Sequence, residues 1–230
     1  MPAIPVRIGE IRQATPTVKT LRLDLQCQPF SFHAGQWIDC YADIDGERRV
    51  AGYTLTSSPN TKGFVEVSVK TGDNPVTRLI HERARAGDTL HIDGGQGNTI
   101  YTRDMGDWLV LIAGGIGITP IMSILRYADE ARDVHATLLY SASTEPELLY
   151  HDEIEAIQRR NTLIRAHLFV TRQKTRYRSG RIDEATLREL AHDPAALYFV
   201  SGPGQMITDT LAALKRLGVA EASIRHERWR

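Results

Sequence analysis

Two glycine-rich segments each follow a short apolar run in this 230-residue chain. GGIGITP (114–120) follows WLVLIA, and SGPGQM (201–206) follows ALYFV. A strand that ends in glycines and opens a helix presents free backbone N–H groups, which together with the helix dipole favour an anion such as a phosphate. Glycines also let the backbone approach that ligand closely. We expect Thr119 to cap the helix and Pro120 to lie in its first turn.

The first segment departs from the dinucleotide fingerprint GxGxxG, because Pro120 stands where the third glycine would be. In addition, no acidic residue follows the second apolar strand, LLYSAS, to hold a ribose. A standard NAD-binding Rossmann enzyme is therefore disfavoured. A tight structural turn is the alternative for either segment alone. Two such turns at strand ends of one sheet instead converge on one crevice, where one suits a pyrophosphate and the other the far end of a dinucleotide.

The elements that would position these turns change in character along the chain. Up to about Tyr101, short runs alternate polar and apolar residues, as in FVEVSVK (64–70), which indicates antiparallel strands of a sandwich or small barrel. After Asp104 the apolar runs are continuous and alternate with helix-length segments, which indicates a doubly wound parallel sheet. We therefore expect two domains, 1–103 and 104–230. The expected helices of the second domain are 119–132, 145–160, 183–191 and 204–217.

Composition excludes several classes of function. The formal net charge is zero, and the basic segment TRQKTRYRSGR (171–181) is short, so we expect no nucleic-acid partner. No apolar run approaches the ~20 residues of a membrane span, and the N-terminus lacks a secretory signal, so we expect a cytoplasmic protein without membrane association. Cys27 and Cys40 are too few for a disulfide framework or an iron–sulfur cluster, and the histidines lack metal-site spacing.

Taken in order, GYTLTSSP (52–59), GGIGITP and SGPGQM resemble the motifs of the ferredoxin–NADP reductase superfamily. Within it, the chain is most similar to the branch described as oxidoreductase NAD-binding domain-containing proteins. The resemblance covers nearly the whole chain. It implies an antiparallel flavin-binding β-barrel followed by an α/β nicotinamide-binding domain, with FAD as the flavin and FMN as the alternative.

The resemblance also implies roles for residues of the first domain. Tyr53 would pack along the flavin, and the Thr54 hydroxyl would lie near the nitrogen that accepts hydride. Ala51 stands where the family has an arginine that grips the flavin phosphate. In NPVTRLI (74–80), Asn74 replaces a glycine and Thr77 replaces a serine, so Thr77 would offer its hydroxyl and backbone N–H to the phosphates. The other implied flavin contacts are Leu55, Val69, Lys70 and, at the C-terminus, Trp229 over the isoalloxazine ring.

In the second domain, the resemblance assigns the first glycine turn to the pyrophosphate of the nicotinamide cofactor and the second turn to the space under its nicotinamide ring. The residues of the first turn are Gly114, Gly115, Gly117, Ile118, Thr119 and Pro120. Those of the second are Ser201, Gly202, Pro203 and Met206. Near the C-terminus, Glu227 matches an acidic residue that ends close to the flavin. Thr54, Ser201 and Glu227 are thus the implied residues of the reacting centre.

The basic segment bears on the choice of coenzyme. In bacterial members of the family, arginines at the positions of Arg172 and Arg181 face the extra phosphate of NADPH. A third cation is absent because Ser143 occupies its place, although Ser141 and Ser143 offer hydroxyls. The missing ribose-binding carboxylate and these two arginines favour NADPH, with NADH as the alternative. The alternative is that these arginines belong to a solvent-exposed loop that binds no coenzyme.

Together these features predict a flavin-dependent oxidoreductase that passes hydride from NAD(P)H to bound flavin. With no room for a fused ferredoxin domain, its electrons would go to a separate acceptor: a redox protein, free flavin or a quinone-like oxidant. Two alternatives have no catalytic role. One is a flavin- and nucleotide-binding subunit or regulator of a larger redox complex, and the other is an interaction scaffold without flavin.

Overall fold

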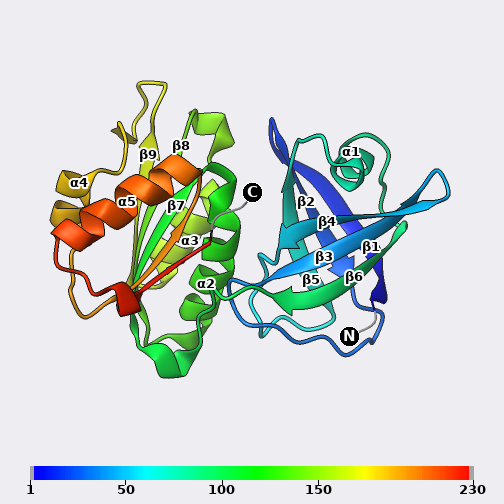
Figure 1. Cartoon of the computed structure of the whole chain (residues 1–230), viewed down its shortest axis with the longest axis horizontal. Helices are drawn as coiled ribbons and strands as arrows, with labels where there is room; N and C mark the ends of the chain where they lie inside the picture. Colours follow the sequence, from blue (N-terminus) through cyan, green and yellow to red (C-terminus); the bar gives the residue numbers. More distant parts are fainter. Residues whose placement is uncertain (1–2, 228–230) are drawn as a thin grey trace.

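The computed structural model describes residues 3–227, which form two domains side by side (Figure 1). The first is a six-stranded antiparallel sheet in the order β4-β3-β6-β1-β2-β5. Its strands are β1 (Ile4–Thr15), β2 (Val18–Asp24), β3 (Trp37–Ile44), β4 (Glu47–Thr54), β5 (Phe64–Lys70) and β6 (Thr89–Gln96). An isolated bridge between Leu55 and Val67 joins the end of β4 to β5, so that the two edge strands meet. The predicted antiparallel barrel is confirmed.

Alternation along the strands explains how the barrel forms. In β5, the side chains of Val65, Val67 and Val69 are buried in the barrel core, as a period-two pattern requires. The helix α1 (Pro75–Glu82) follows β5 and buries Val76 and Ile80 in the same core. The C-terminal end of β5 and the start of α1 are thereby held next to the end of β4.

The second domain is a parallel sheet in the order β10-β9-β8-β7-β11-β12. Its strands are β7 (Trp108–Gly114), β8 (His135–Ala142), β9 (Ile164–Val170), β10 (Arg178–Ser179), β11 (Leu197–Ser201) and β12 (Ile224–His226). The helices are α2 (Ile118–Ala131), α3 (His151–Arg160), α4 (Glu184–Leu190) and α5 (Gly204–Arg216). The strand order reverses between β7 and β11, and ligands of such sheets bind at this switch point. The predicted doubly wound fold is confirmed.

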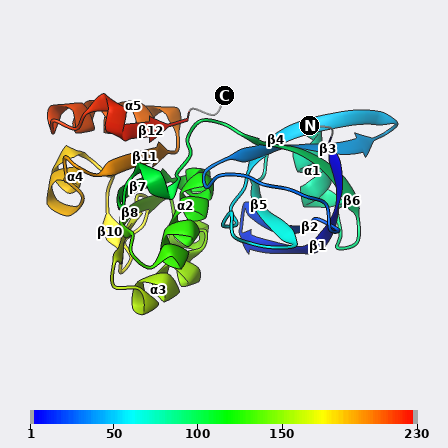
Figure 2. The ribbon, with the colours of Figure 1, turned by 90° about the horizontal axis from the view of Figure 1, so that it is seen from below.

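Figures 1 and 2 both place α2 between the sheet and the barrel. Successive residues of β7 point to opposite faces: Leu109 and Leu111 pack in the core on the α2 and α3 side, and Val110 and Ile112 pack in the core with α4 and α5. Covering on both faces explains why the strands read as continuous apolar runs.

The helix expected over 145–160 is wrong in its first part. A 3₁₀ turn, η3, covers Glu145–Glu147, and α3 begins only at His151. Tyr150 has a left-handed backbone with φ of 61°, and the Leu149 amide donates to the Glu147 carbonyl and the Tyr140 hydroxyl, not to the carbonyl four residues earlier that an α-helix would use. The other three predicted helices agree with the structure to within one residue at each end.

The division after residue 103 stays a prediction; it falls in the segment between β6 and β7 that contains a second 3₁₀ turn, η1 (Arg103–Met105). Within residues 3–227, no helix is long and apolar enough to cross a membrane.

Candidate cofactor site between the two domains

A pocket of about 380 Å³ lies between the barrel and the parallel sheet. The end of β4 and the end of β5 form its barrel side, and the two glycine-rich turns form the other side. The lining residues are Gly52, Tyr53, Thr54, Ser68, Val69, Lys70, Gly114, Gly115, Ile116, Gly117, Thr119, Gly202, Pro203 and Gly204. The turns follow β7 and β11, at the switch point of the sheet. They therefore converge on one crevice, as their sequence pattern predicted.

The glycines of the first turn serve two different purposes. A Cβ atom on Gly117 would lie 2.5 Å from the carbonyl of Ser201, so this glycine lets the two turns pack directly against each other. Gly114 likewise has the side chains of Met206 and Pro203 against it. Gly115 differs, because it has a φ of +54° and no atom lies within 4 Å of its Cβ position. Only Gly115 combines a left-handed backbone with open space in the pocket.

The cap predicted for α2 is wrong. The 3₁₀ turn η2 (Gly115–Gly117) runs directly into α2, whose N-cap is Gly117 and which has no side-chain cap. Thr119 is the second helical residue, and its hydroxyl donates to the Ile116 carbonyl at 3.0 Å. Because the helix starts earlier than predicted, Thr119 lies inside it. Its hydroxyl bonds to the turn, and the residue still lines the pocket.

Ser201 ends β11 beneath the second turn. Its side chain is buried, and within residues 3–227 its hydroxyl has no hydrogen-bond partner. A buried hydroxyl without a protein partner is uncommon and calls for an explanation such as a ligand or water. Ser201 is not itself among the lining residues of the pocket, but its neighbours Gly202 and Pro203 are.

On the barrel side, a hydrogen bond joins the Tyr53 and Thr77 hydroxyls at 2.9 Å. Burial raises the pKa of Tyr53, and the bond to Thr77 only partly opposes this, so the phenol stays neutral. Thr77 lies in the first turn of α1 and does not line the pocket. The Asn74 side chain caps α1 by accepting from the Val76 amide at 2.8 Å and donates to the Val50 carbonyl at 3.0 Å. This side chain ties the helix start to β4.

A smaller hollow of about 220 Å³ continues the crevice towards the end of β8. It shares Lys70, Gly115 and Ile116 with the first pocket and adds Ser143 and Glu147. The Glu147 carboxylate accepts hydrogen bonds from the hydroxyls of Thr15 and Thr17 in the barrel, at 3.1 and 2.8 Å. The sequence predicted no acidic residue after the second strand to hold a ribose; Glu147 lies five residues beyond this strand, and η3 folds it back into the crevice, where it is bonded to the two threonines.

The other predicted residues lie around these hollows. The Arg172 amide donates to the Ser143 carbonyl at 3.0 Å, so the start of the basic segment adjoins the end of β8. The side chains of Arg172 and Arg181 are exposed, form no ion pair with another described residue and line neither hollow. Ser141 pairs with Gly114 in the sheet. Leu55, Ile118 and Pro120 are buried beside the pocket, and Met206 packs on Gly114.

Glu227 is the last residue that the structure describes, and its side chain lies next to Trp37 of β3. Trp37 is the cross-strand partner of Thr54, which brings the Glu227 carboxyl near the barrel side of the pocket. Burial raises the pKa of this carboxyl, and a hydrogen bond with Trp37 opposes the rise. Trp229 lies outside the described residues.

Four lining residues were missed from the sequence: Gly52, Ser68, Ile116 and Gly204. All four are immediate neighbours of predicted residues, and the two glycines have only backbone to contribute. Ser68 carried a usable signal, since it directly precedes Val69 and Lys70, two of the flavin contacts that the resemblance implies.

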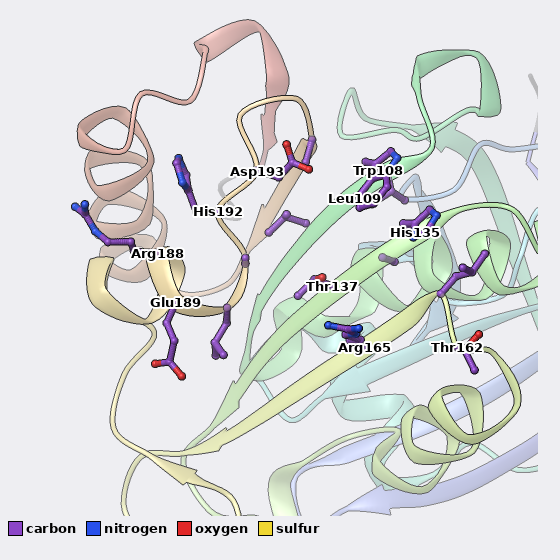
Figure 3. A pocket seen from close by; sticks show the side chains of 16 residues that line it. Trp108, Leu109, His135, Thr137, Thr162, Arg165, Arg188, Glu189, His192 and Asp193 are labelled. Atoms are coloured by element: carbon purple, nitrogen blue, oxygen red, sulfur yellow. The ribbon is translucent and has the colours of Figure 1, made fainter.

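A hollow of about 510 Å³, larger than both of these, lies at the amino ends of β7 and β8, and none of the predicted residues lines it (Figure 3). There the ring of Trp108 stacks on that of His135, with centroids 4.0 Å apart. Since the switch point lies at the carboxyl ends of the strands, size does not identify the cofactor site in this fold.

Comparison with known proteins agrees with this geometry. Residues 5–101 match the oxidoreductase FAD-binding domain family, and residues 111–211 match the oxidoreductase NAD-binding domain family. The oxidoreductase NAD-binding domain-containing protein 1 of Danio rerio is 31% identical over 258 residues, an alignment covering 100% of this chain and 93% of that protein. This chain therefore belongs to the family of oxidoreductase NAD-binding domain-containing proteins. The predicted resemblance to the ferredoxin–NADP reductase superfamily, with FAD and a nicotinamide dinucleotide as cofactors, is confirmed.

Solved structures share the fold of this family member. The flavohem-like FAD/NAD-binding domain of a nitric oxide dioxygenase from Vibrio cholerae superposes with a TM-score of 0.89 at 21% identity, covering 98% of both chains. A ferredoxin NADP+ reductase from Neisseria gonorrhoeae, solved with bound FAD and NADP, gives a TM-score of 0.84 at 21% identity, covering 99% of this chain and 98% of that one.

Proposed function

We propose that this family member is an enzyme that passes hydride from a reduced nicotinamide dinucleotide to bound FAD and then passes electrons to a separate acceptor. The observation that carries the proposal is the interdomain pocket. It joins Tyr53 and Thr54 of the flavin motif to both glycine turns of the nucleotide domain. Hydride transfer requires two flat rings in contact, and a single crevice lined from both domains is where such contact can occur.

The residues present suit these cofactors. The open Cβ position of Gly115 leaves room for a phosphate against the backbone, and the buried Ser201 hydroxyl, next to two lining residues, has no hydrogen-bond partner within residues 3–227. When bound, FAD supplies the hydride acceptor and can release electrons one or two at a time. We assign Thr54 to hydrogen bonding at the reacting edge of the flavin, Ser201 to the face of the nicotinamide, and Glu227 to a carboxyl at the border of the site.

The flavin phosphate would be held differently from the family pattern. Ala51 is buried and has no guanidinium to offer, and the Asn74 amide already bonds to Val50. These departures favour the second candidate function, a flavin- and nucleotide-binding subunit without turnover of its own. The two functions separate in a steady-state assay: an enzyme oxidises NADH or NADPH in the presence of a small electron-accepting dye. A protein that binds FAD and coenzyme but shows no dye-dependent oxidation is the non-catalytic subunit.

For the coenzyme, two observations favour different outcomes. Arg172 and Arg181 are exposed cations, and the backbone of Arg172 adjoins the end of β8; both favour the extra phosphate of NADPH. Glu147 places a carboxylate in the same part of the crevice, which favours the free ribose hydroxyls of NADH. We propose NADPH, because the Glu147 carboxylate is already bonded to Thr15 and Thr17.

A double substitution tests this choice. A charge-assisted hydrogen bond contributes roughly 1.5–3 kcal/mol, so Arg172→Ala/Arg181→Ala should weaken NADPH binding by about a hundredfold or more and leave NADH binding nearly unchanged. Catalytic efficiency with each coenzyme is the measurement. A wild type that prefers NADH, together with a gain of NADPH activity in Glu147→Gln, would instead show that Glu147 decides the preference.

A further inference from the structure

Arg126 is a buried cation that bonds both domains. It lies on α2, two turns after the glycine-rich turn, and only 16% of its side chain is exposed. Its Nη1 atom reaches the barrel, donating to the Thr56 carbonyl at 2.7 Å and to Glu66 at 2.8 Å. Its Nε and Nη2 atoms both bond to Glu153 of α3 at 2.7 Å. The two edges of one planar guanidinium thus hold different domains.

The surroundings of Arg126 are ordered by further bonds. Its guanidinium lies 5.1 Å from the ring centroid of Tyr150, whose hydroxyl is 2.6 Å from that of Ser68 on β5. The Thr56 hydroxyl donates to Glu66 at 2.8 Å. Burial opposes the charge on Arg126, but the bond to Glu153 and the charge of Glu66 more than offset this and raise its pKa. The cation therefore stays charged, and it donates hydrogen bonds to Thr56, Glu66 and Glu153.

These contacts involve the same elements that form the pocket. Glu66 and Ser68 lie on β5, whose last residues, Val69 and Lys70, line the barrel side. Thr56 follows Thr54 by two residues. On the other side, α2 is continuous with the turn that contains Gly115. The guanidinium of Arg126 consequently bridges the elements that form the two walls of the pocket.

We propose that Arg126 is a positioning residue for hydride transfer, and that it aligns the flavin and nicotinamide halves of the pocket through its bond to Glu66; this rests on the proposed function. Stability alone is a weak explanation for a buried ion pair, because desolvation cancels much of its attraction. Alignment of the two reacting rings is a stronger explanation, because a misplacement of about 1 Å between reacting groups can lower the rate about a hundredfold.

The two carboxylates that flank Arg126 provide a matched pair of variants. Glu66→Gln and Glu153→Gln remove the same charge from the same guanidinium, but only Glu66 belongs to the other domain. Other bonds between the domains remain in both variants, including that from the Ser123 hydroxyl to the Ser57 carbonyl. Neither variant should therefore separate the domains. Arg126→Lys is a third variant, which keeps the charge but lacks the fork needed to reach both domains.

The experiment measures FAD reduction by stopped flow at saturating coenzyme, with the affinities for FAD and coenzyme determined separately. We expect Glu66→Gln and Arg126→Lys to slow reduction at least tenfold, to weaken the charge-transfer absorbance of the stacked rings, and to change either affinity less than about threefold. Glu153→Gln should slow reduction less than about threefold. Equal slowing in the two glutamine variants, or no slowing in Glu66→Gln, would overturn the proposal.

A second readout does not depend on activity. Spin labels on the exposed native Cys27 of the barrel and at the exposed position 215 of α5, in a Lys215→Cys background, report the distance between the domains. We expect this distance distribution to shift or broaden in Glu66→Gln and to stay as in the wild type in Glu153→Gln. If coenzyme does not reduce the flavin of the wild type at all, the proposed function fails. The label distances then decide whether Arg126 positions the two domains, and an unchanged distribution in Glu66→Gln overturns that role.

Discussion

The two walls of the interdomain pocket differ in whether backbone or side chains form them. The nucleotide wall consists mostly of backbone, with the two glycine turns packed against each other at Gly117 and Ser201. The barrel wall depends on side chains, with the Tyr53 hydroxyl joined to Thr77 and the Asn74 amide joined to Val50. Adding a single methyl group should therefore damage the nucleotide wall most. On the barrel wall, the damaging change is the removal of a hydroxyl.

The largest effect is expected from Gly117→Ala. The new methyl group would lie 2.5 Å from the Ser201 carbonyl, so the two turns must move apart. Overpacking of this kind costs about 1–3 kcal/mol of stability, and displaced turns should lose nearly all coenzyme affinity. Thermal unfolding and coenzyme titration are the measurements, with FAD retention as the internal control. Loss of FAD to the same degree as coenzyme would contradict the division into two walls.

Gly115→Ala sharpens the contrast within the same turn. Its methyl group meets no protein atom, so the expected cost to stability is the left-handed backbone alone, about 1–2 kcal/mol. Coenzyme affinity should still fall, since the methyl group enters the space assigned to the phosphate. Calorimetric titration with NADH and NADPH checks this; unchanged affinity would remove Gly115 from the binding surface.

On the barrel wall, we expect Thr54→Ala to slow flavin reduction about fivefold and to leave flavin retention nearly unchanged. The hydroxyl is assigned to the reacting edge, and one hydrogen bond contributes about 1 kcal/mol. Stopped-flow reduction of the fully FAD-loaded variant is the measurement. An unchanged rate would exclude Thr54 from the reacting centre.

Tyr53→Phe tests the other contact of this wall. It removes the bond to the buried Thr77 hydroxyl, which should cost about 1 kcal/mol of stability and weaken FAD binding with no change in coenzyme affinity. Thr77→Val breaks the same bond from the other side. In a double-mutant cycle, the combined variant should therefore lose less than the sum of the two single losses. Strict additivity would show that the pair does not act as a unit.

The smallest effect concerns pH. Burial raises the pKa of Glu227 from its ordinary value of 4.5, so the folded state binds this proton more tightly than the unfolded state. The resulting stabilisation is present below the ordinary value and is lost as the pH rises through the raised value. The stability of the wild type relative to Glu227→Gln should accordingly fall over that range. A constant difference across the range would show that Glu227 does not titrate with folding.

The sequence predicted the arrangement of the fold well, because alternation in β5 and continuous apolar runs such as β7 report directly on how each strand is covered. The convergence of the two glycine turns followed from the same patterns. What it missed depends on long-range contacts. Nothing in the local sequence shows that η3 folds Glu147 back towards Thr15 and Thr17, or that Gly117 contacts Ser201. Arg126 looks like an ordinary helix residue in the sequence, because its contact with Glu66 of the barrel is long-range.

The central claim is that one crevice brings flavin and reduced nicotinamide together for hydride transfer. The most direct test is anaerobic mixing of the FAD-loaded protein with NADPH and, separately, with NADH, while the visible absorbance of the flavin is followed. The proposed function predicts that the flavin band bleaches at a rate that saturates with coenzyme concentration, faster with NADPH. A flavin band that persists in the presence of both coenzymes, in a protein that binds FAD, would contradict it.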